Sequence, residues 1–336
     1  MKNLKKLPLI LSILSLASFI TPVNADVKVV ASIKPLHSLA SYLMDGVGKP
    51  DLIVEGYGSP HGFSMKPSHA KILQNADLIF WVGEDLEIFL EKPLSSIAKK
   101  AEKIELMEIK GLNVLIFRER NIFDEHDHDD HDDHGKKEDD HDDHEHDDHD
   151  KKEEHADHDD HDGHEGHAHG EYDPHIWLDP MNAKVILNKM VEHLIENDAK
   201  NASKYKSNLK NAFKDIDKLT ADVKADLSKS TASIVFHDAY QYFEERFDIN
   251  ILGAFTVNTD VMPGAEQLSE IREIIEHDKV SCIFSEPQFN PDIINAVAKD
   301  MDIKTGILDP LGATLNPGKN LYFDLIRNMS DSFKGC

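Results

Sequence analysis

Short apolar runs alternate along most of the chain with stretches in which apolar residues recur at helical spacing. The runs predict strands at residues 27–33, 51–55, 77–82, 103–107, 233–236, 249–256, 282–284 and 304–308. The spacing predicts helices at residues 35–44, 68–75, 86–99, 183–196, 240–246, 265–278, 291–301 and 322–333. Strands that alternate with helices form βαβ units, so we expect an α/β fold of two lobes, each with a parallel sheet.

One long helix is predicted between the two groups of strands, at about residues 199–228. The stretch is polar, but apolar residues recur in it at helical spacing, at Tyr205, Leu209, Phe213, Ile216 and Leu219. A single narrow apolar stripe is typical of a helix that packs by one face. We expect a rigid connector inside a helical region at 181–230, between an N-terminal lobe (26–180) and a C-terminal lobe (231–336).

Charge replaces the apolar pattern at residues 124–171. This insert holds 24 acidic residues, four lysines and 14 of the 21 histidines, so it contributes −20 to the chain's net charge of −26. Almost no apolar side chain is available there to offset the entropy of ordering, so we expect a flexible insert in the N-terminal lobe. The acidic balance argues against nucleic acid as a partner, because phosphate binding needs a basic face, and it suits attraction of cations.

The first 25 residues have the features of an export signal. Lys2, Lys5 and Lys6 precede an apolar run at 7–20, and a small-x-small cleavage site ends at Ala25. The run is short for a membrane span. We therefore expect cleavage near Ala25 and an exported, soluble mature chain; the alternative is an uncleaved membrane anchor.

Four potential metal ligands follow predicted strands or the insert. His61, His237 and Asp309 come after the strands at 51–55, 233–236 and 304–308, and His175 comes directly after the insert. Ligands of parallel α/β sheets bind beyond the carboxyl ends of the strands, so we expect the four to meet between the lobes. Three imidazoles and one carboxylate suit tetrahedral Zn²⁺. The alternative for each residue is an ordinary surface or hydrogen-bonded side chain.

Four other histidines, His37, His69, His193 and His277, fall on predicted helices, and we expect them at the surface. Cys282 and Cys336 are the only two cysteines. Export makes a disulfide between them chemically reasonable, and two free thiols are the alternative.

Several motifs, in order along the mature chain, resemble the metal-specific, long-helix group of ABC-transporter solute-binding proteins, and within it the periplasmic zinc-binding proteins of bacterial zinc uptake. The motifs are ASIKP at 31–35, SPHGFSMKPS at 59–68, LQNAD at 73–77, WVG at 81–83, HIWL at 175–178, FHDAYQYF at 236–243, FTVN at 255–258, PGA at 263–265, SEPQF at 285–289 and LDPLG at 308–312. A histidine- and aspartate-rich insert is also a feature of the zinc-specific members.

The resemblance implies two α/β lobes joined by one long helix, with the metal site in the cleft between them. It implies His61, His175 and His237 as ligands, and Asp309 as the carboxylate that completes the site in many members. Some zinc members have an acidic ligand just before the first histidine, where this chain has Pro60. Asp309 or a water must therefore fill the fourth position. The resemblance also implies a Cys282–Cys336 disulfide.

The function implied by the resemblance is capture of Zn²⁺ in the periplasm and its delivery to the membrane permease of an ABC importer, which a cytoplasmic ATPase drives. Zinc is then a transported ligand, and the protein is a monomer and not an enzyme. Manganese-binding relatives carry a carboxylate at the position of His237, which makes a Mn²⁺ receptor the weaker alternative. Further alternatives are a periplasmic zinc store, an adhesin, and a zinc hydrolase, for which no His-Glu-x-x-His motif is present.

The insert is expected to be a second and weaker metal-binding element. Most of its histidines recur every two or three residues among carboxylates, so they form many exchanging sites that gather zinc, buffer it or pass it to periplasmic shuttling proteins. Loading should fade as pH falls through about 6.5, because only neutral imidazole binds metal. The histidines are His126, His128, His131, His134, His141, His144, His146, His149, His155, His158, His161, His164, His167 and His169.

Overall fold

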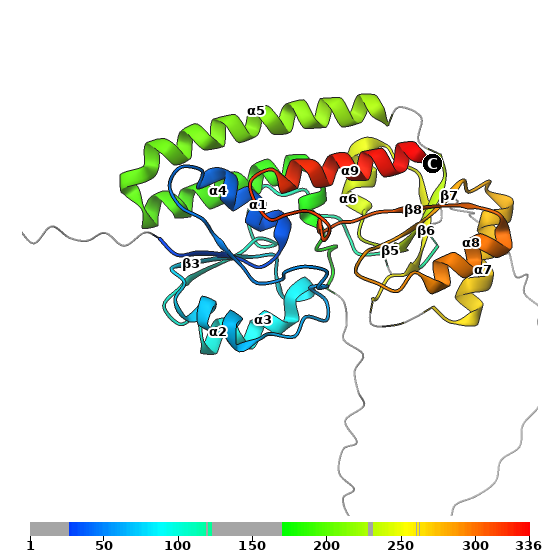
Figure 1. The fold of residues 1–336 in the computed structure, drawn as a ribbon, viewed down its shortest axis with the longest axis horizontal. Coiled ribbons are helices and arrows are strands. Elements are labelled where there is room, and N and C mark those ends of the chain that lie inside the picture. The colour runs from blue at the N-terminus through cyan, green and yellow to red at the C-terminus, as the bar shows by residue number, and fades with distance from the viewer. Residues whose placement is uncertain (1–26, 119, 123–169, 228–230, 260, 262) are drawn as a thin grey trace, which may run out of the picture.

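The computed structural model describes residues 27–118, 120–122, 170–227, 231–259, 261 and 263–336. The expected export signal and the fourteen insert histidines lie outside these residues. Two α/β lobes lie side by side, and the long helix α5 runs across both of them (Figure 1). No helix in the described part of the chain is long and apolar enough to cross a membrane.

The N-terminal lobe is built on a four-stranded parallel sheet with the strand order β2-β1-β3-β4. Its central strands are fully buried, as expected of a sheet covered by helices on both faces. The strands are β1 (Val29–Ala31), β2 (Asp51–Leu52), β3 (Leu78–Trp81) and β4 (Glu102–Glu105). The helices of this part are α1 (Lys34–Leu43), α2 (Pro67–Gln74), α3 (Glu84–Ser96) and α4 (Pro180–Asn197).

The C-terminal lobe repeats this topology, because its parallel sheet has the order β6-β5-β7-β8. In each sheet the first strand of the lobe pairs with the second and the third. The strands are β5 (Ser233–His237), β6 (Ile251–Thr256), β7 (Cys282–Ser285) and β8 (Lys304–Ile307). The helices are α6 (Gln241–Phe247), α7 (Ala265–His277), α8 (Asp292–Met301) and α9 (Leu321–Gly335). The predicted α/β class with two parallel sheets is confirmed.

The long connector is α5 (Ala202–Asp226), and a 3-10 turn, η2 (Ala199–Asn201), precedes it. Tyr205, Ile216 and Leu219 of the predicted stripe are buried, whereas Leu209 and Phe213 are only partly covered. Asn208 lies on the same face, where its Nδ2 donates to the carbonyls of Leu43 and Asp45 at the end of α1. The helix is therefore fastened to the N-terminal lobe by a polar contact as well as by its apolar stripe.

Helix α9 is the last helix of the chain, yet it packs against α1 and α5 as well as beside the C-terminal sheet. Tyr322 of α9 forms two hydrogen bonds with the N-terminal lobe. Its backbone N–H donates to Ser38 Oγ, and its hydroxyl donates to the carbonyl of Trp177. Lys34, at the start of α1, reaches the C-terminal lobe and donates to the carbonyls of Gly312, Ala313 and Leu315. The lobes thus share one hydrophobic core and several buried hydrogen bonds.

The predicted disulfide is confirmed, since Cys282 on β7 is bonded to Cys336 at the end of α9. It closes a loop of 54 residues and anchors α9 to the C-terminal sheet. In the chain-entropy account a loop of this size stabilises the fold by about 4 kcal/mol, mainly by restricting the unfolded chain.

We expect the C282A/C336A variant to unfold at a lower urea concentration than the oxidised wild type. The expected loss of unfolding free energy is about 2–4 kcal/mol. Reduced wild-type protein is the matched control and should resemble the double variant. Equal midpoints for the oxidised and reduced wild type would contradict a stabilising disulfide.

Candidate metal site

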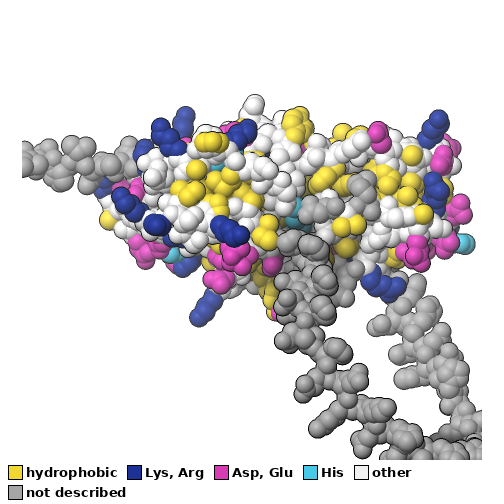
Figure 2. All heavy atoms as spheres, turned by 90° about the horizontal axis from the view of Figure 1, so that it is seen from below, with side chains coloured by type: hydrophobic (Ala, Val, Ile, Leu, Met, Phe, Trp, Pro, Cys, Tyr) yellow, Lys and Arg dark blue, Asp and Glu magenta, His cyan; other side chains and the backbone are white. Residues whose placement is uncertain are grey.

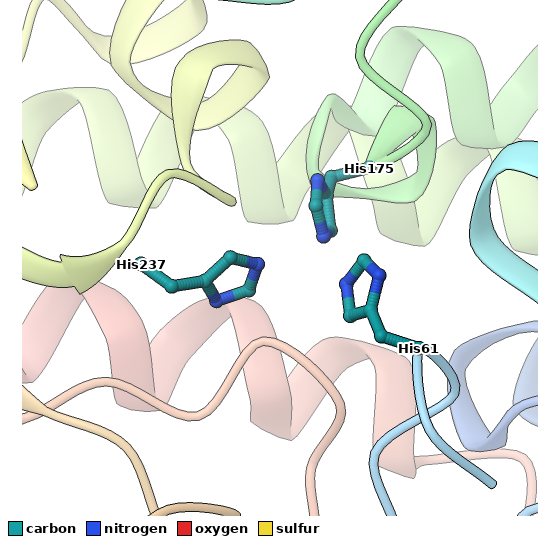
Figure 3. Close-up of side chains that lie close together, drawn as sticks. All are labelled: His61, His175 and His237. Atoms are coloured by element: carbon teal, nitrogen blue, oxygen red, sulfur yellow. The ribbon is translucent and has the colours of Figure 1, made fainter. Parts of the chain in front are cut away.

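Three of the four predicted ligands come together between the lobes. His61 lies in the loop after β2, His175 precedes the 3-10 turn η1 (Ile176–Leu178), and His237 is the last residue of β5. One potential ligand atom of each lies within 4.8 Å of the other two. The rings face a common point (Figure 3), with centroids 5.0–5.6 Å apart. A histidine side chain is also visible between the lobes in the space-filling view (Figure 2).

His237 is oriented by a buried carboxylate. Its Nδ1 lies 2.9 Å from Oε1 of Glu286, which follows β7, and both side chains are about 95% buried or more. Burial disfavours the charged ring, but the charge and the hydrogen bond of Glu286 outweigh it and raise the pKa of His237 above its ordinary value. With Nδ1 held by Glu286, the other nitrogen, Nε2, is left for a ligand; it is buried and has no hydrogen-bond partner among the described residues.

His175 has the same kind of support from Asp173. Its Nδ1 lies 2.7 Å from Asp173 Oδ1, and its backbone N–H donates to the same oxygen. Burial, together with the nearby His237, holds the pKa of His175 well below its ordinary value, so the ring is neutral. Metal-binding histidines characteristically give their second nitrogen to a carboxylate in this way.

These two carboxylates were not predicted as part of the site. Asp173 stands two residues before His175, in Asp-Pro-His, and Glu286 follows the third strand of the C-terminal lobe. A signal for both was available in the sequence, because Glu286 directly follows a predicted strand and Asp173 stands two residues before a predicted ligand.

Asp309 is not among the donors that converge within 4.8 Å. Its Oδ1 accepts a hydrogen bond from Gln288 Nε2, at 3.0 Å. Its Oδ2 accepts from the backbone N–H and the hydroxyl of Thr314. Both oxygens are therefore engaged within the C-terminal lobe, and ligation by Asp309 stays a prediction.

A further ion pair links the histidine site to the segment that enters the insert. Arg118 lies 3.3 Å from Asp238, the residue after His237, and 2.6 Å from Glu244. Four residues later, Ile122 forms a bridge with Gly253 on β6. The chain thus crosses to the edge of the C-terminal sheet before the insert begins, although the whole of 26–180 was expected in the N-terminal lobe.

Of the four helix histidines expected at the surface, one is exposed, two are partly covered and one is buried. His69 is 4% exposed, accepts from the backbone N–H of Lys66 and stacks on Phe63, so its predicted exposure is wrong. His37 is partly buried, and one ring nitrogen lies 3.1 Å from the carbonyl of Pro50. His277 is exposed, as expected. Short helices with few apolar residues do not define which face is covered, so these positions depend on the neighbouring loops.

His193 belongs to a second cluster of donors, with Glu102 and Glu196. The side chains of these two glutamates are 42% and 67% exposed, and Nδ1 of His193 forms an ion pair with Glu102. Unlike the interlobe site, this cluster has no buried carboxylate that orients the imidazole. We assign no metal to it.

Two small cavities flank the three histidines, each with room for about one water-sized sphere. All three histidines line the first, together with Trp177 and Gln288. They also line the second, whose other walls include Gly170 and Tyr172 at the end of the insert. The second cavity thus lies beside the point where the insert rejoins the folded chain.

Relatives with known names were found over nearly the full length of the chain. The high-affinity zinc uptake system protein ZnuA of Brucella abortus is 48% identical over 310 residues, which are 92% of this chain and 91% of that protein. The protein of the same name from Haemophilus influenzae is 40% identical over 344 residues, covering 100% of this chain and 99% of that protein.

A solved structure shares the fold. A zinc-bound deletion mutant of ZnuA superimposes with a TM-score of 0.69 at 18% identity, over 92% of this chain and 97% of that chain. The family described as zinc-uptake complex component A, periplasmic, matches residues 29–336. On this match and on the identity to its named relatives, the chain belongs to the family of periplasmic zinc-uptake complex A components.

Proposed function

We propose that this protein is the periplasmic receptor of a zinc ABC importer, and that it binds Zn²⁺ between its lobes through His61, His175 and His237. The observation that carries the proposal is the convergence of three imidazoles, contributed by both lobes, within 4.8 Å. A fourth position is left for Asp309 or a water. The zinc-uptake names of its relatives support the same cargo.

The donor set favours zinc over harder cations. Three nitrogen donors with at most one carboxylate suit Zn²⁺, whereas Mn²⁺ prefers sites richer in oxygen. The carboxylates near the site, Asp173 and Glu286, already face His175 and His237. They therefore support the imidazoles and do not add oxygen ligands.

Release of zinc to the permease would use small movements of the lobes. Helix α5, the contact of Tyr322 with Trp177 and the three hydrogen bonds of Lys34 all resist a wide hinge opening. Slight tilting of the lobes would still separate His237 from His61 and His175, because each lobe supplies part of the donor set. Docking of the lobes on the permease, driven by its ATPase, would supply that tilt.

The remaining parts of the chain fit the same role. The export signal would be cleaved near Ala25, and the mature monomer would act in the periplasm. The insert at 124–171 would gather or buffer zinc and exchange it with periplasmic shuttling proteins. In support, Gly170 and Tyr172 line a cavity with the three histidines, so zinc carried by the insert would arrive beside the site.

Zinc titration calorimetry on the mature protein tests the site. We expect one tight site in the wild type, and we expect it to survive deletion of residues 124–171. In the deleted protein, H61A/H237A should weaken binding at least about 100-fold, because losing ligands costs more than losing their supporting partners.

H193A in the same deleted protein is the matched control, since it removes a histidine of the second cluster and should leave the tight site unchanged. Loss of the tight site on deletion of the insert alone would contradict the proposal and would favour a zinc store.

The supporting carboxylates give a separate prediction. D173N and E286Q should each weaken zinc binding about 10–100-fold, because a neutral amide holds the imidazole less firmly and lowers its basicity. Affinity is measured by competition with a chromophoric chelator. E276Q, an exposed change on α7, is the control. Unchanged affinity in both variants would show that these carboxylates serve only the fold.

A further inference from the structure

Gln288 has an amide whose two ends lie in different surroundings. It follows β7, two residues after Glu286, and its Nε2 donates to Asp309 Oδ1 at 3.0 Å. A carboxylate only accepts hydrogen bonds, so this contact fixes which end of the amide faces Asp309. The oxygen, Oε1, must therefore point away from Asp309.

Oε1 of Gln288 is buried and has no hydrogen-bond donor among the described residues. Gln288 lines the small cavity that also contains His61, His175 and His237. Buried polar atoms are normally paired, and an exception next to a ligand site indicates a partner that arrives with the ligand. Nε2 of His237 is buried in the same cavity and is likewise without a partner in this part of the structure.

We propose that Gln288 positions the water molecule that completes the coordination of zinc, and that Asp309 acts by orienting Gln288. This inference rests on the proposed zinc site. Three histidines leave the fourth position of a tetrahedral ion open, and a water there would become a strong hydrogen-bond donor. The neutral amide oxygen of Gln288 is an acceptor that can hold this water without taking its proton.

The contacts of Asp309 support an orienting role. Thr314 holds Oδ2 through its N–H and its hydroxyl, and Oδ1 accepts from Gln288. The loop that carries Asp309 is itself fastened, since Lys34 donates to the carbonyls of Gly312 and Ala313. In direct ligation a carboxylate oxygen of Asp309 would be shared between zinc and a hydrogen-bond donor, whereas the orienting role uses the contacts as they stand.

A double-mutant cycle in the protein lacking residues 124–171 distinguishes these roles. Zinc affinity is measured by chelator competition for the wild type, Q288M, D309N and Q288M/D309N. Q288M keeps the length of the side chain and removes the oxygen, so we expect about 10-fold weaker binding. D309N should have a smaller effect, and that effect should vanish in the Q288M background, because residues that act through one contact are not additive.

Three further readouts separate this role from a purely structural one. Metal-free Q288M should stay folded and unfold at a temperature close to that of the wild type, because the loss of an unpaired buried oxygen offsets the loss of the hydrogen bond to Asp309. The visible absorption of the Co²⁺-loaded protein should change in Q288M but not in the control Q74M, which lies on the exposed face of α2. The exchanged pair Q288E/D309N restores a contact between an amide and a carboxylate at these two positions, and should bind zinc more tightly than Q288M.

Two outcomes would overturn this inference and leave the proposed zinc site standing. In the first, Q288M binds zinc as tightly as the wild type. In the second, D309N weakens binding equally with and without Q288M, which would make Asp309 a direct ligand. A tight site that survives H61A/H237A would instead overturn the proposed zinc site, and this inference with it.

Discussion

The hydrogen bonds from His175 to Asp173 and from His237 to Glu286 determine which nitrogen of each buried ring is available to a cation. Without these carboxylates, two imidazoles inside a closed interface could rotate or change tautomer, and each arrangement would present a different donor set. Each carboxylate contacts one ring nitrogen, so the donor atoms left for a cation in the cavity are imidazole nitrogens. A soft, nitrogen-rich site of this kind suits zinc and is poor for cations that require oxygen.

This donor set depends on how the two lobes are held together. His237 comes from the C-terminal sheet, whereas His61 comes from the N-terminal lobe, so the spacing of the rings is a property of the interface. Buried contacts across it, from Lys34 and Tyr322, favour one relative position of the lobes. Because the donor atoms come from both lobes, a small change in that position would alter the spacing between them.

The insert is connected to the same interface at both of its ends. Before the insert, Arg118 pairs with Asp238 next to His237, and Ile122 joins the edge of the C-terminal sheet. After the insert, the chain pairs Tyr172 with Ile116 and then reaches Asp173 and His175. The residues on either side of the insert are therefore held by the same contacts that surround His175 and His237.

The sequence by itself determined the class of fold, because parallel strands buried on both faces leave continuous apolar runs and their helices leave a helical period. It also pointed to His61 and His237, since residues after parallel strands gather at one edge of a sheet, and to His175, which follows the insert. Only the tertiary structure decided the rest: which carboxylates support the rings, that Asp309 is engaged by Gln288 and Thr314, and that His69 is buried. Those facts depend on contacts such as His237–Glu286, 49 positions apart, and Gln288–Asp309, 21 positions apart, or on the packing of short loops. Local hydrophobic periodicity carries no information about either.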